Sequence, residues 1–130
     1  MKLLLDTHAV IWSAEPADGH RLSRLSRTAI EEPANELLIS AASAWEIATK
    51  HRRGRLPAGG KIVRRWTEIL AQLGATDLPI TSVHGLLAGG FDAPNRDPFD
   101  RILAAQAIVE GARLVTADRA MDGFGAELLW

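Results

Sequence analysis

The chain has 130 residues, of which 47% are hydrophobic and 24% are charged, and its formal net charge is −1. This composition excludes a disordered chain, and the length fits a single domain over residues 1–130. The absence of cysteine excludes a disulfide framework, a thiolate zinc site and a cysteine nucleophile. The three leucines after Lys2 are too few for a signal peptide, and the longest uncharged run holds a proline and three glycines. We therefore expect a cytoplasmic protein without a membrane span.

Positive charge is concentrated between Arg21 and Arg65, where ten Lys and Arg residues stand against four Asp and Glu residues. The rest of the chain has five basic residues against twelve acidic ones. A basic stretch is typical of a surface that faces a polyanion, although a solvated helix face gives the same pattern.

The N-terminal part of the chain predicts a strand followed by helices. Lys2–Leu5 is an unbroken apolar run typical of a central strand, and Asp6 then caps a helix that continues through Trp12. Glu15–Gly19 is predicted to be a loop. The apolar spacing over residues 22–30 predicts an amphipathic helix.

Glu36–Ser40 is the second predicted strand, and a helix follows it. The helix start has two interpretations. If it begins at Ser43, Glu46 has the spacing of a capping box and binds the helix backbone. If it begins nearer Ser40, the Glu46 carboxylate is free to face the strand ends.

The middle of the chain predicts a loop at residues 57–60 and one amphipathic helix over residues 62–73. Residues 77–80 predict an edge strand, because a proline cannot donate to a strand ladder on one side. Thr81 or Ser82 is expected to cap a short helix that reaches Gly89 and Gly90.

The clearest helix signal is Asp97-Pro98-Phe99-Asp100, which combines a strong N-cap residue with a proline in the first turn, and Gly111 ends this helix. Residues 113–116 and 126–130 predict two further strands. Strands that alternate with helices predict a three-layer α/β/α fold with a mostly parallel sheet of four or five strands.

Acidic residues follow or begin several of these elements. Asp6 and Asp118 end apolar runs, while Glu46, Asp97 and Asp100 lie near helix starts. Right-handed crossovers bring the ends of the first and fourth strands to one rim, so these carboxylates can meet there. Like charges at close range need a proton or a cation, and oxygen-only ligands favour Mg²⁺ or Mn²⁺. Such a site can hydrolyse phosphodiesters with water that the ion activates.

Other catalytic patterns are weak in this sequence. The four histidines are scattered and are interpreted as packing or surface residues, and no serine has a nucleophile-elbow context. The sequence also lacks a P-loop and a glycine fingerprint for dinucleotides. The four tryptophans lie in apolar patterns and are predicted to belong to the core.

Four segments together resemble a PIN domain, and more narrowly a VapC-type toxin of a type II toxin–antitoxin pair. They are Leu5-Asp6-Thr7-His8, residues 43–48 (Ser-Ala-Trp-Glu-Ile-Ala), residues 96–107 with Asp97-Pro98-Phe99-Asp100, and residues 114–118 (Leu-Val-Thr-Ala-Asp). Each motif is weak alone, but the four occur in the family's order over essentially the whole chain.

The resemblance implies a Mg²⁺- or Mn²⁺-dependent endoribonuclease that leaves a 5′-phosphate and a 3′-hydroxyl. It assigns the catalytic and metal-binding carboxylates to Asp6, Glu46, Asp100 and Asp118 and gives Thr116 a supporting role. Asp97 either joins the acidic pocket or serves as the helix cap. The resemblance further implies a homodimer and a VapB-like antitoxin whose tail covers the acidic groove.

Among the basic residues, Arg52 and Arg53 are the expected RNA contacts because they follow Glu46 on the same predicted helix. Two other classes of function remain open. One is a phosphatase or phosphotransferase with Asp6 as nucleophile, although His8 stands where such sites commonly carry a second acid. The other is a non-catalytic module that only binds a cation.

Overall fold

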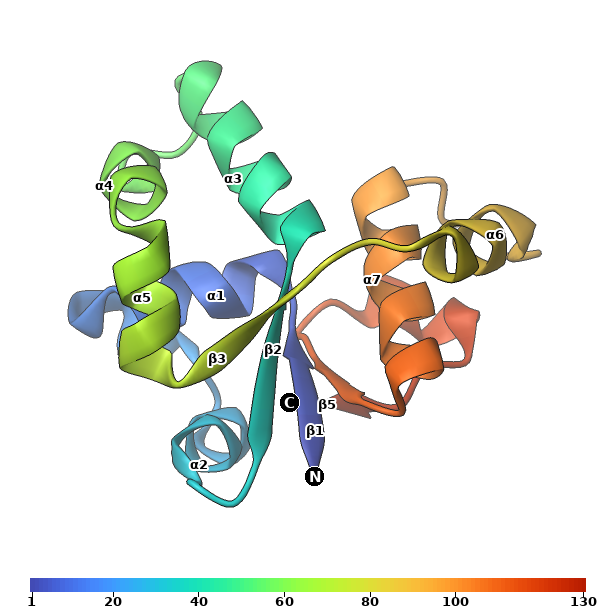
Figure 1. Cartoon of the computed structure of the whole chain (residues 1–130), viewed down its shortest axis with the longest axis horizontal. Helices are drawn as coiled ribbons and strands as arrows, with labels where there is room; N and C mark the ends of the chain where they lie inside the picture. The colour runs from blue at the N-terminus through green and yellow to red at the C-terminus, as the bar shows by residue number, and fades with distance from the viewer.

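Short apolar runs form the strands of a five-stranded sheet in the computed structural model, which describes residues 1–130 (Figure 1). The strands are β1 (Lys2–Leu5), β2 (Glu36–Ser40), β3 (Ala75–Leu78), β4 (Arg113–Val115) and β5 (Leu128–Leu129). Their order is β3-β2-β1-β4-β5, and all neighbouring strands are parallel. The carboxyl ends of all five strands therefore lie on one rim, which is where ligands bind in open parallel sheets.

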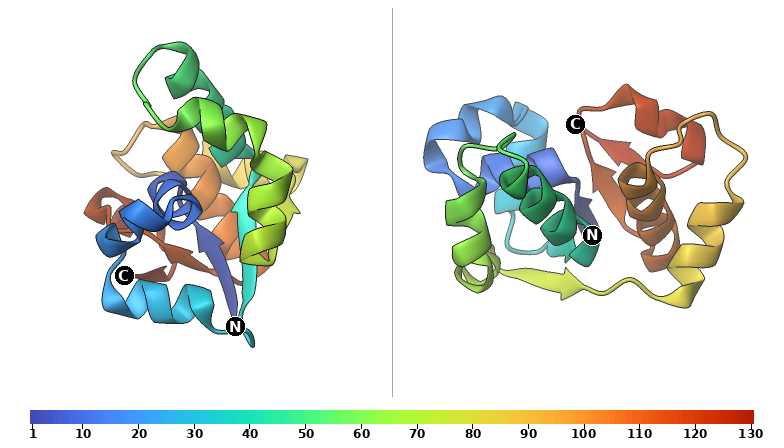
Figure 2. Two further views of the ribbon diagram at one scale, coloured as in Figure 1. Left: turned by 90° about the vertical axis from the view of Figure 1, so that its left-hand side faces the viewer. Right: turned by 90° about the horizontal axis from the view of Figure 1, so that it is seen from above.

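Helices cover both faces of this sheet, which confirms the predicted three-layer α/β/α fold (Figure 2). They are α1 (Thr7–Ala14), α2 (Arg24–Glu31), α3 (Ala41–Arg52), α4 (Gly59–Arg64), α5 (Trp66–Leu73), α6 (Ser82–Gly90) and α7 (Pro98–Glu110). Two 3-10 helices, η1 (Pro16–Arg21) and η2 (Arg119–Phe124), complete the chain. None of the helices combines the length and the apolar character that a membrane crossing requires.

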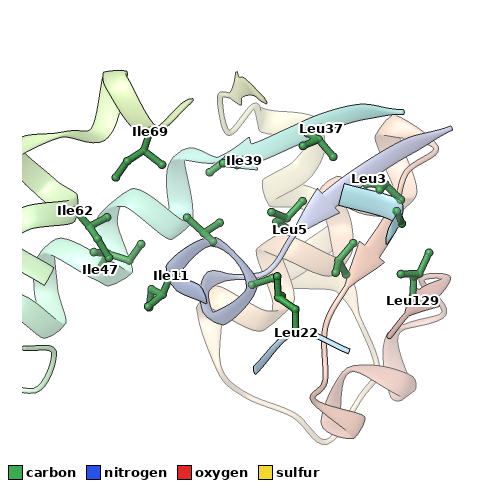
Figure 3. Packing of buried hydrophobic residues seen from close by; sticks show 14 residues of the cluster. Leu3, Leu5, Ile11, Leu22, Leu37, Ile39, Ile47, Ile62, Ile69 and Leu129 are labelled. Carbon is green, nitrogen blue, oxygen red and sulfur yellow. The ribbon is translucent and has the colours of Figure 1, made fainter. Parts of the chain in front are cut away.

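The core has two halves because successive side chains of a strand point to opposite faces. Leu3 and Leu5 of β1 pack in a cluster that includes Ile47 of α3 and Ile62 of α4 (Figure 3). Leu4 belongs to the other half of the core, which residues of α7 and η2 cover. The central strand is therefore buried on both faces, as its unbroken apolar sequence predicted.

The predicted helix boundaries are correct where a cap residue marks them. Asp6, Thr81 and Asp97 accept backbone N–H groups at the starts of α1, α6 and α7. Gly111 ends α7 with a φ of 65°, a conformation that favours glycine. At α3 the structure decides between the two starts: Ser40 is the N-cap, so the capping-box interpretation of Ser43 and Glu46 is wrong.

Several weaker predictions are also wrong. Residues 16–21 form η1 rather than a loop, η2 was not predicted, and the last strand contains only Leu128 and Leu129. The helix predicted over residues 62–73 is divided at Arg65 into α4 and α5. Ile62 and Ile69 both remain in the core, so the bend lets one apolar stripe follow a curved surface.

Trp45 contradicts the prediction that all four tryptophans are core residues. Its relative exposure is 64%, whereas Trp12, Trp66 and Trp130 are partly buried against the core. The Trp45 ring meets the edge of the Phe99 ring at a centroid distance of 5.0 Å. The pair therefore connects the second turn of α3 with the first turn of α7 at the molecular surface.

Two helical glycines offer a matched test of packing. A Cβ atom on Gly59 would lie 2.8 Å from the Cβ atom of His51, whereas a Cβ atom on Gly85 would meet nothing within 4 Å. We expect Gly59→Ala to lower the free energy of unfolding by about 1–3 kcal/mol through this clash. Gly85→Ala should raise it by about 0.5–1 kcal/mol, because alanine loses less backbone entropy in a helix. Urea unfolding curves of the two variants measure both signs, and equal effects would contradict the close packing of α3 against α4.

Candidate functional site

Asp6 lies where β1 ends and α1 begins, at the centre of the strand-end rim. Its Oδ1 atom accepts the backbone N–H of Ala9 at 2.7 Å, and only 9% of the residue is exposed. Burial raises the pKa of the Asp6 carboxyl, while the Thr116 hydroxyl and the Ala9 N–H partly oppose that rise. The fold thus keeps an acidic group in a place where its charge is poorly solvated.

Glu46 is held by Thr7, the residue that follows Asp6 in the chain. The Thr7 hydroxyl donates to Glu46 Oε1 at 2.7 Å and lies 3.1 Å from the Ser43 hydroxyl. The other carboxylate oxygen, Oε2, forms an ion pair with Lys50 Nζ at 2.7 Å. Because Ser40 is the N-cap of α3, Glu46 lies in the second turn and contacts Thr7 rather than its own helix backbone.

Asp97 and Asp100 occupy the start of α7. Oδ1 of Asp97 accepts the backbone N–H groups of Phe99 and Asp100 at 2.8 and 3.2 Å, so Asp97 is the helix cap. The Asn95 amide donates to Asp100 Oδ2 at 3.0 Å. Burial raises the pKa of Asp100, the Asn95 bond lowers it, and the charges of Asp97, Asp118 and Glu46 raise it further.

Arg101 fixes the segment that carries Asn95. Its guanidinium donates to the carbonyl oxygens of Ala88 and Asn95, each at 2.9 Å, and to that of Phe91. The planar guanidinium has enough donors to hold several carbonyls at once. Arg101 therefore supports Asp100 indirectly, through the position of Asn95.

Asp118 follows β4 and caps η2, where its Oδ1 atom accepts the Ala120 N–H at 2.9 Å. The buried Thr116 hydroxyl accepts the Asp118 N–H at 3.0 Å. Thr116 and Asp118 also line one end of a groove of about 800 Å³, which extends along Leu25 of α2 and Leu128 of β5. Among the acidic residues of the rim, Asp118 alone lines this groove.

The structure brings the predicted carboxylates to one region. The charge of Asp118 acts on Asp6, and the charges of Asp118 and Glu46 act on Asp100. The starts of α1, α3 and α7 all lie at the upper end of the sheet in Figure 1. In this side-chain arrangement, however, no three acidic or histidine groups are close enough to share one ion. The donor set of carboxylate oxygens suits a hard divalent cation.

Arg52 and Arg53 lie apart from this cluster. Both are exposed at the far end of α3 and form no ion pair with a carboxylate. An α-helix rises 1.5 Å per residue, so Arg52 lies about 9 Å along the axis from Glu46. Lys50 is therefore the basic residue in contact with the acidic rim.

The sequence interpretation assigned no role to Thr7 or Asn95 and considered Ser43 only as a helix cap, although these side chains hold Glu46 and Asp100. Their signal is proximity in sequence: Thr7 directly follows Asp6, and Asn95 lies two residues before Asp97. A hydroxyl or amide next to a predicted acidic ligand is therefore a useful indicator of a supporting residue.

The raised pKa of Asp100 predicts a stability effect. A carboxyl whose pKa is higher in the folded than in the unfolded state binds its proton more readily when folded, so ionisation destabilises the fold at neutral pH. Without metal, Asp100→Asn should raise the unfolding temperature by about 2–5 °C at pH 7. The gain should shrink as the pH falls, because the wild-type carboxyl then protonates, and its raised pKa makes this begin above the ordinary range of an aspartate. Thermal unfolding followed by circular dichroism measures the gain in unfolding temperature, and Asp92→Asn in an exposed loop serves as control. A gain that grows on acidification would contradict the raised pKa of Asp100.

Comparisons with known proteins agree with this geometry. A family model of the PIN domain matches residues 3–126. The chain is 37% identical over 118 residues to Ribonuclease VapC22 of Mycobacterium tuberculosis, an alignment that covers 90% of this chain and 87% of that protein. It is 33% identical over 72 residues to Ribonuclease VapC16 of the same organism, which covers 50% of this chain and 51% of the relative.

Solved structures share the fold at low sequence identity. VapBC2 from Rickettsia felis, bound to a DNA fragment from its promoter, matches with a TM-score of 0.68 and 14% identity, over 100% of this chain and 98% of that one. FitAcB from Neisseria gonorrhoeae matches with a TM-score of 0.66 and 15% identity, over 98% and 96%. Since the family model spans nearly the whole sequence and a relative of 37% identity covers most of it, the chain belongs to the PIN domain family.

Proposed function

We propose that this protein is a VapC-type endoribonuclease toxin that depends on Mg²⁺ or Mn²⁺. The observation that carries the proposal is the group of carboxylates at the strand-end rim of a PIN domain. The similarity to Ribonuclease VapC22 supports RNA as the substrate. Asp6, Glu46, Asp100 and Asp118 would hold the divalent cation.

The chain's own residues would prepare this site. A divalent cation supplies charge neutralisation at the attacked phosphate and lowers the pKa of water. Thr7 orients Glu46, Asn95 orients Asp100, and the backbone fixes Asp6 through its cap. Thr116 supports the site by accepting from the Asp118 N–H beside Asp6. Hydrolysis would leave a 5′-phosphate and a 3′-hydroxyl.

Asp6 is poorly suited to act as a phosphotransferase nucleophile. It is buried, and one of its oxygens is fixed by the helix backbone. Burial also raises the pKa of its carboxyl, because the ionised form is poorly solvated there. A role as metal ligand agrees better with this environment, because a bound cation stabilises the ionised form.

We further infer a cognate antitoxin and a homodimeric assembly. The fold matches chains from VapBC2 and FitAcB. Exposed apolar side chains on α6, Val83 and Leu86, provide the kind of surface that a partner covers.

Cleavage of structured RNA tests the proposal directly. Asp6→Asn keeps an N-cap residue, so the fold should survive while cleavage falls by about 100-fold or more. Wild-type activity should require Mg²⁺ or Mn²⁺ and stop with EDTA, and a monophosphate-dependent exonuclease should degrade the products. Growth arrest on expression should also be relieved by Asp6→Asn. Metal-independent cleavage by Asp6→Asn would refute the proposal. A phosphoryl adduct on Asp6 would favour a phosphotransferase. Absence of cleavage by a wild-type protein that binds the metal would indicate a cation-binding module.

The roles of Arg52 and Arg53 are tested by charge reversal. Arg52→Glu combined with Arg53→Glu should weaken RNA binding and reduce the slope of log affinity against log salt by about 1–2, because phosphate contacts release counterions. The matched control is Lys2→Glu with Arg113→Glu at the opposite rim of the sheet, where β1 and β4 begin. An unchanged slope in the first pair would show that Arg52 and Arg53 do not contact phosphates.

A further inference from the structure

Each carboxylate oxygen of Glu46 has a side-chain partner in this protein. Oε1 accepts the Thr7 hydroxyl, and Oε2 pairs with the Lys50 ammonium, each at 2.7 Å. Lys50 lies one helical turn after Glu46, and its side chain is 36% exposed, so it reaches both the acidic rim and the solvent.

This pair is unique among the ion pairs of the chain. None of the others involves Asp6, Asp100 or Asp118. They are Asp18–Arg21, Glu15–Lys61, Arg65–Glu68, His84–Glu110 and Arg113–Glu127. The remaining carboxylates of the rim are held by neutral donors: Ala9 N–H, the Asn95 amide and Ala120 N–H. Lys50 is therefore the single formal positive charge paired with the acidic cluster.

We propose that Lys50 is the resident counter-cation of Glu46 and a positioning residue for RNA. It neutralises Glu46 in the metal-free protein, and when Glu46 turns to a divalent ion, the ammonium is released to a phosphate of the bound RNA. This inference rests on the proposed nuclease function.

The orientation of Glu46 does not depend on the charge of Lys50. Thr7, backed by Ser43, holds Oε1 whether or not Lys50 is present. Loss of Lys50 therefore removes a positive charge next to the ion site but leaves Glu46 oriented. Two cations that compete for one carboxylate oppose each other strongly at contact distance. Lysine also suits a transfer between partners, because its ammonium sits on a flexible stem and has three donors.

Two binding measurements on Lys50→Gln test the inference. Calorimetric titration with Mn²⁺ alone should show affinity about threefold to tenfold higher than in wild type, because the competing charge is gone. Fluorescence anisotropy with a labelled single-stranded RNA in Ca²⁺, with the RNA checked for integrity, should show affinity about threefold to tenfold lower. In EDTA, where Glu46 retains Lys50, RNA affinity should change little.

Two variants serve as controls. Lys50→Arg keeps the positive charge and should resemble wild type in both titrations. Arg113→Gln removes a cation that pairs with Glu127 at 3.3 Å on the opposite rim, and should alter neither affinity. Circular dichroism establishes that all variants are folded.

The outcomes separate this inference from the proposed function. If wild type binds Mn²⁺ and Asp6→Asn does not, but Lys50→Gln equals wild type in both titrations, Lys50 is an ordinary helix-stabilising partner and the inference is wrong. Weaker Mn²⁺ binding by Lys50→Gln also overturns it, because Lys50 would then orient Glu46 for the ion. If wild type does not bind Mn²⁺ at all, the proposed function and the inference both fail.

Discussion

Electrostatic repulsion at the carboxyl ends of the strands is the constraint on which the site depends. The parallel order of β2, β1 and β4 brings Asp6, Glu46 and Asp118 to one rim, and α7 adds Asp100. Backbone N–H groups, hydroxyls and an amide stabilise these carboxylates individually, but neutral donors do not cancel their combined charge. A positive charge is therefore required at the rim, and in this chain Lys50 supplies one.

The rigidity of the core prevents the acidic groups from moving apart. Leu3, Leu4 and Leu5 are fully buried immediately before Asp6, and each contributes about 1.5–3 kcal/mol by leaving water. Any shift of Asp6 away from its neighbours would disturb this packing on both faces of the sheet. The buried leucines of β1 thus hold Asp6 in a place where its charge is poorly solvated. The pKa values of the Asp6 and Asp100 carboxyls therefore stay raised.

Local sequence signals predicted most of the fold, because caps and buried strands depend on neighbouring residues. Asp6, Asp97 and Gly111 marked helix ends correctly. Long-range packing decided the rest: Trp45 has the apolar pattern of a core residue, but its neighbour Glu46 points to the rim and Trp45 rests on Phe99 at the surface. Family motifs suggested the carboxylates, and adjacency to Asp6 marks Thr7 as a supporting residue, but its bond to Glu46 could not be predicted because the two residues lie 39 positions apart in sequence.

An aspartate at this rim can cap a helix with one carboxylate oxygen and offer the other to a second partner. Asp6, Asp97 and Asp118 each use Oδ1 to accept backbone N–H groups at a helix start, which fixes the side chain and leaves the second oxygen for another partner. Glu46 lies in the second turn of α3 and has no such backbone anchor. Its orientation must come from other side chains, and Thr7 supplies it. Lys50 contacts the remaining oxygen, so the carboxylate without a cap is also the one at which we propose that a protein cation and a metal ion compete.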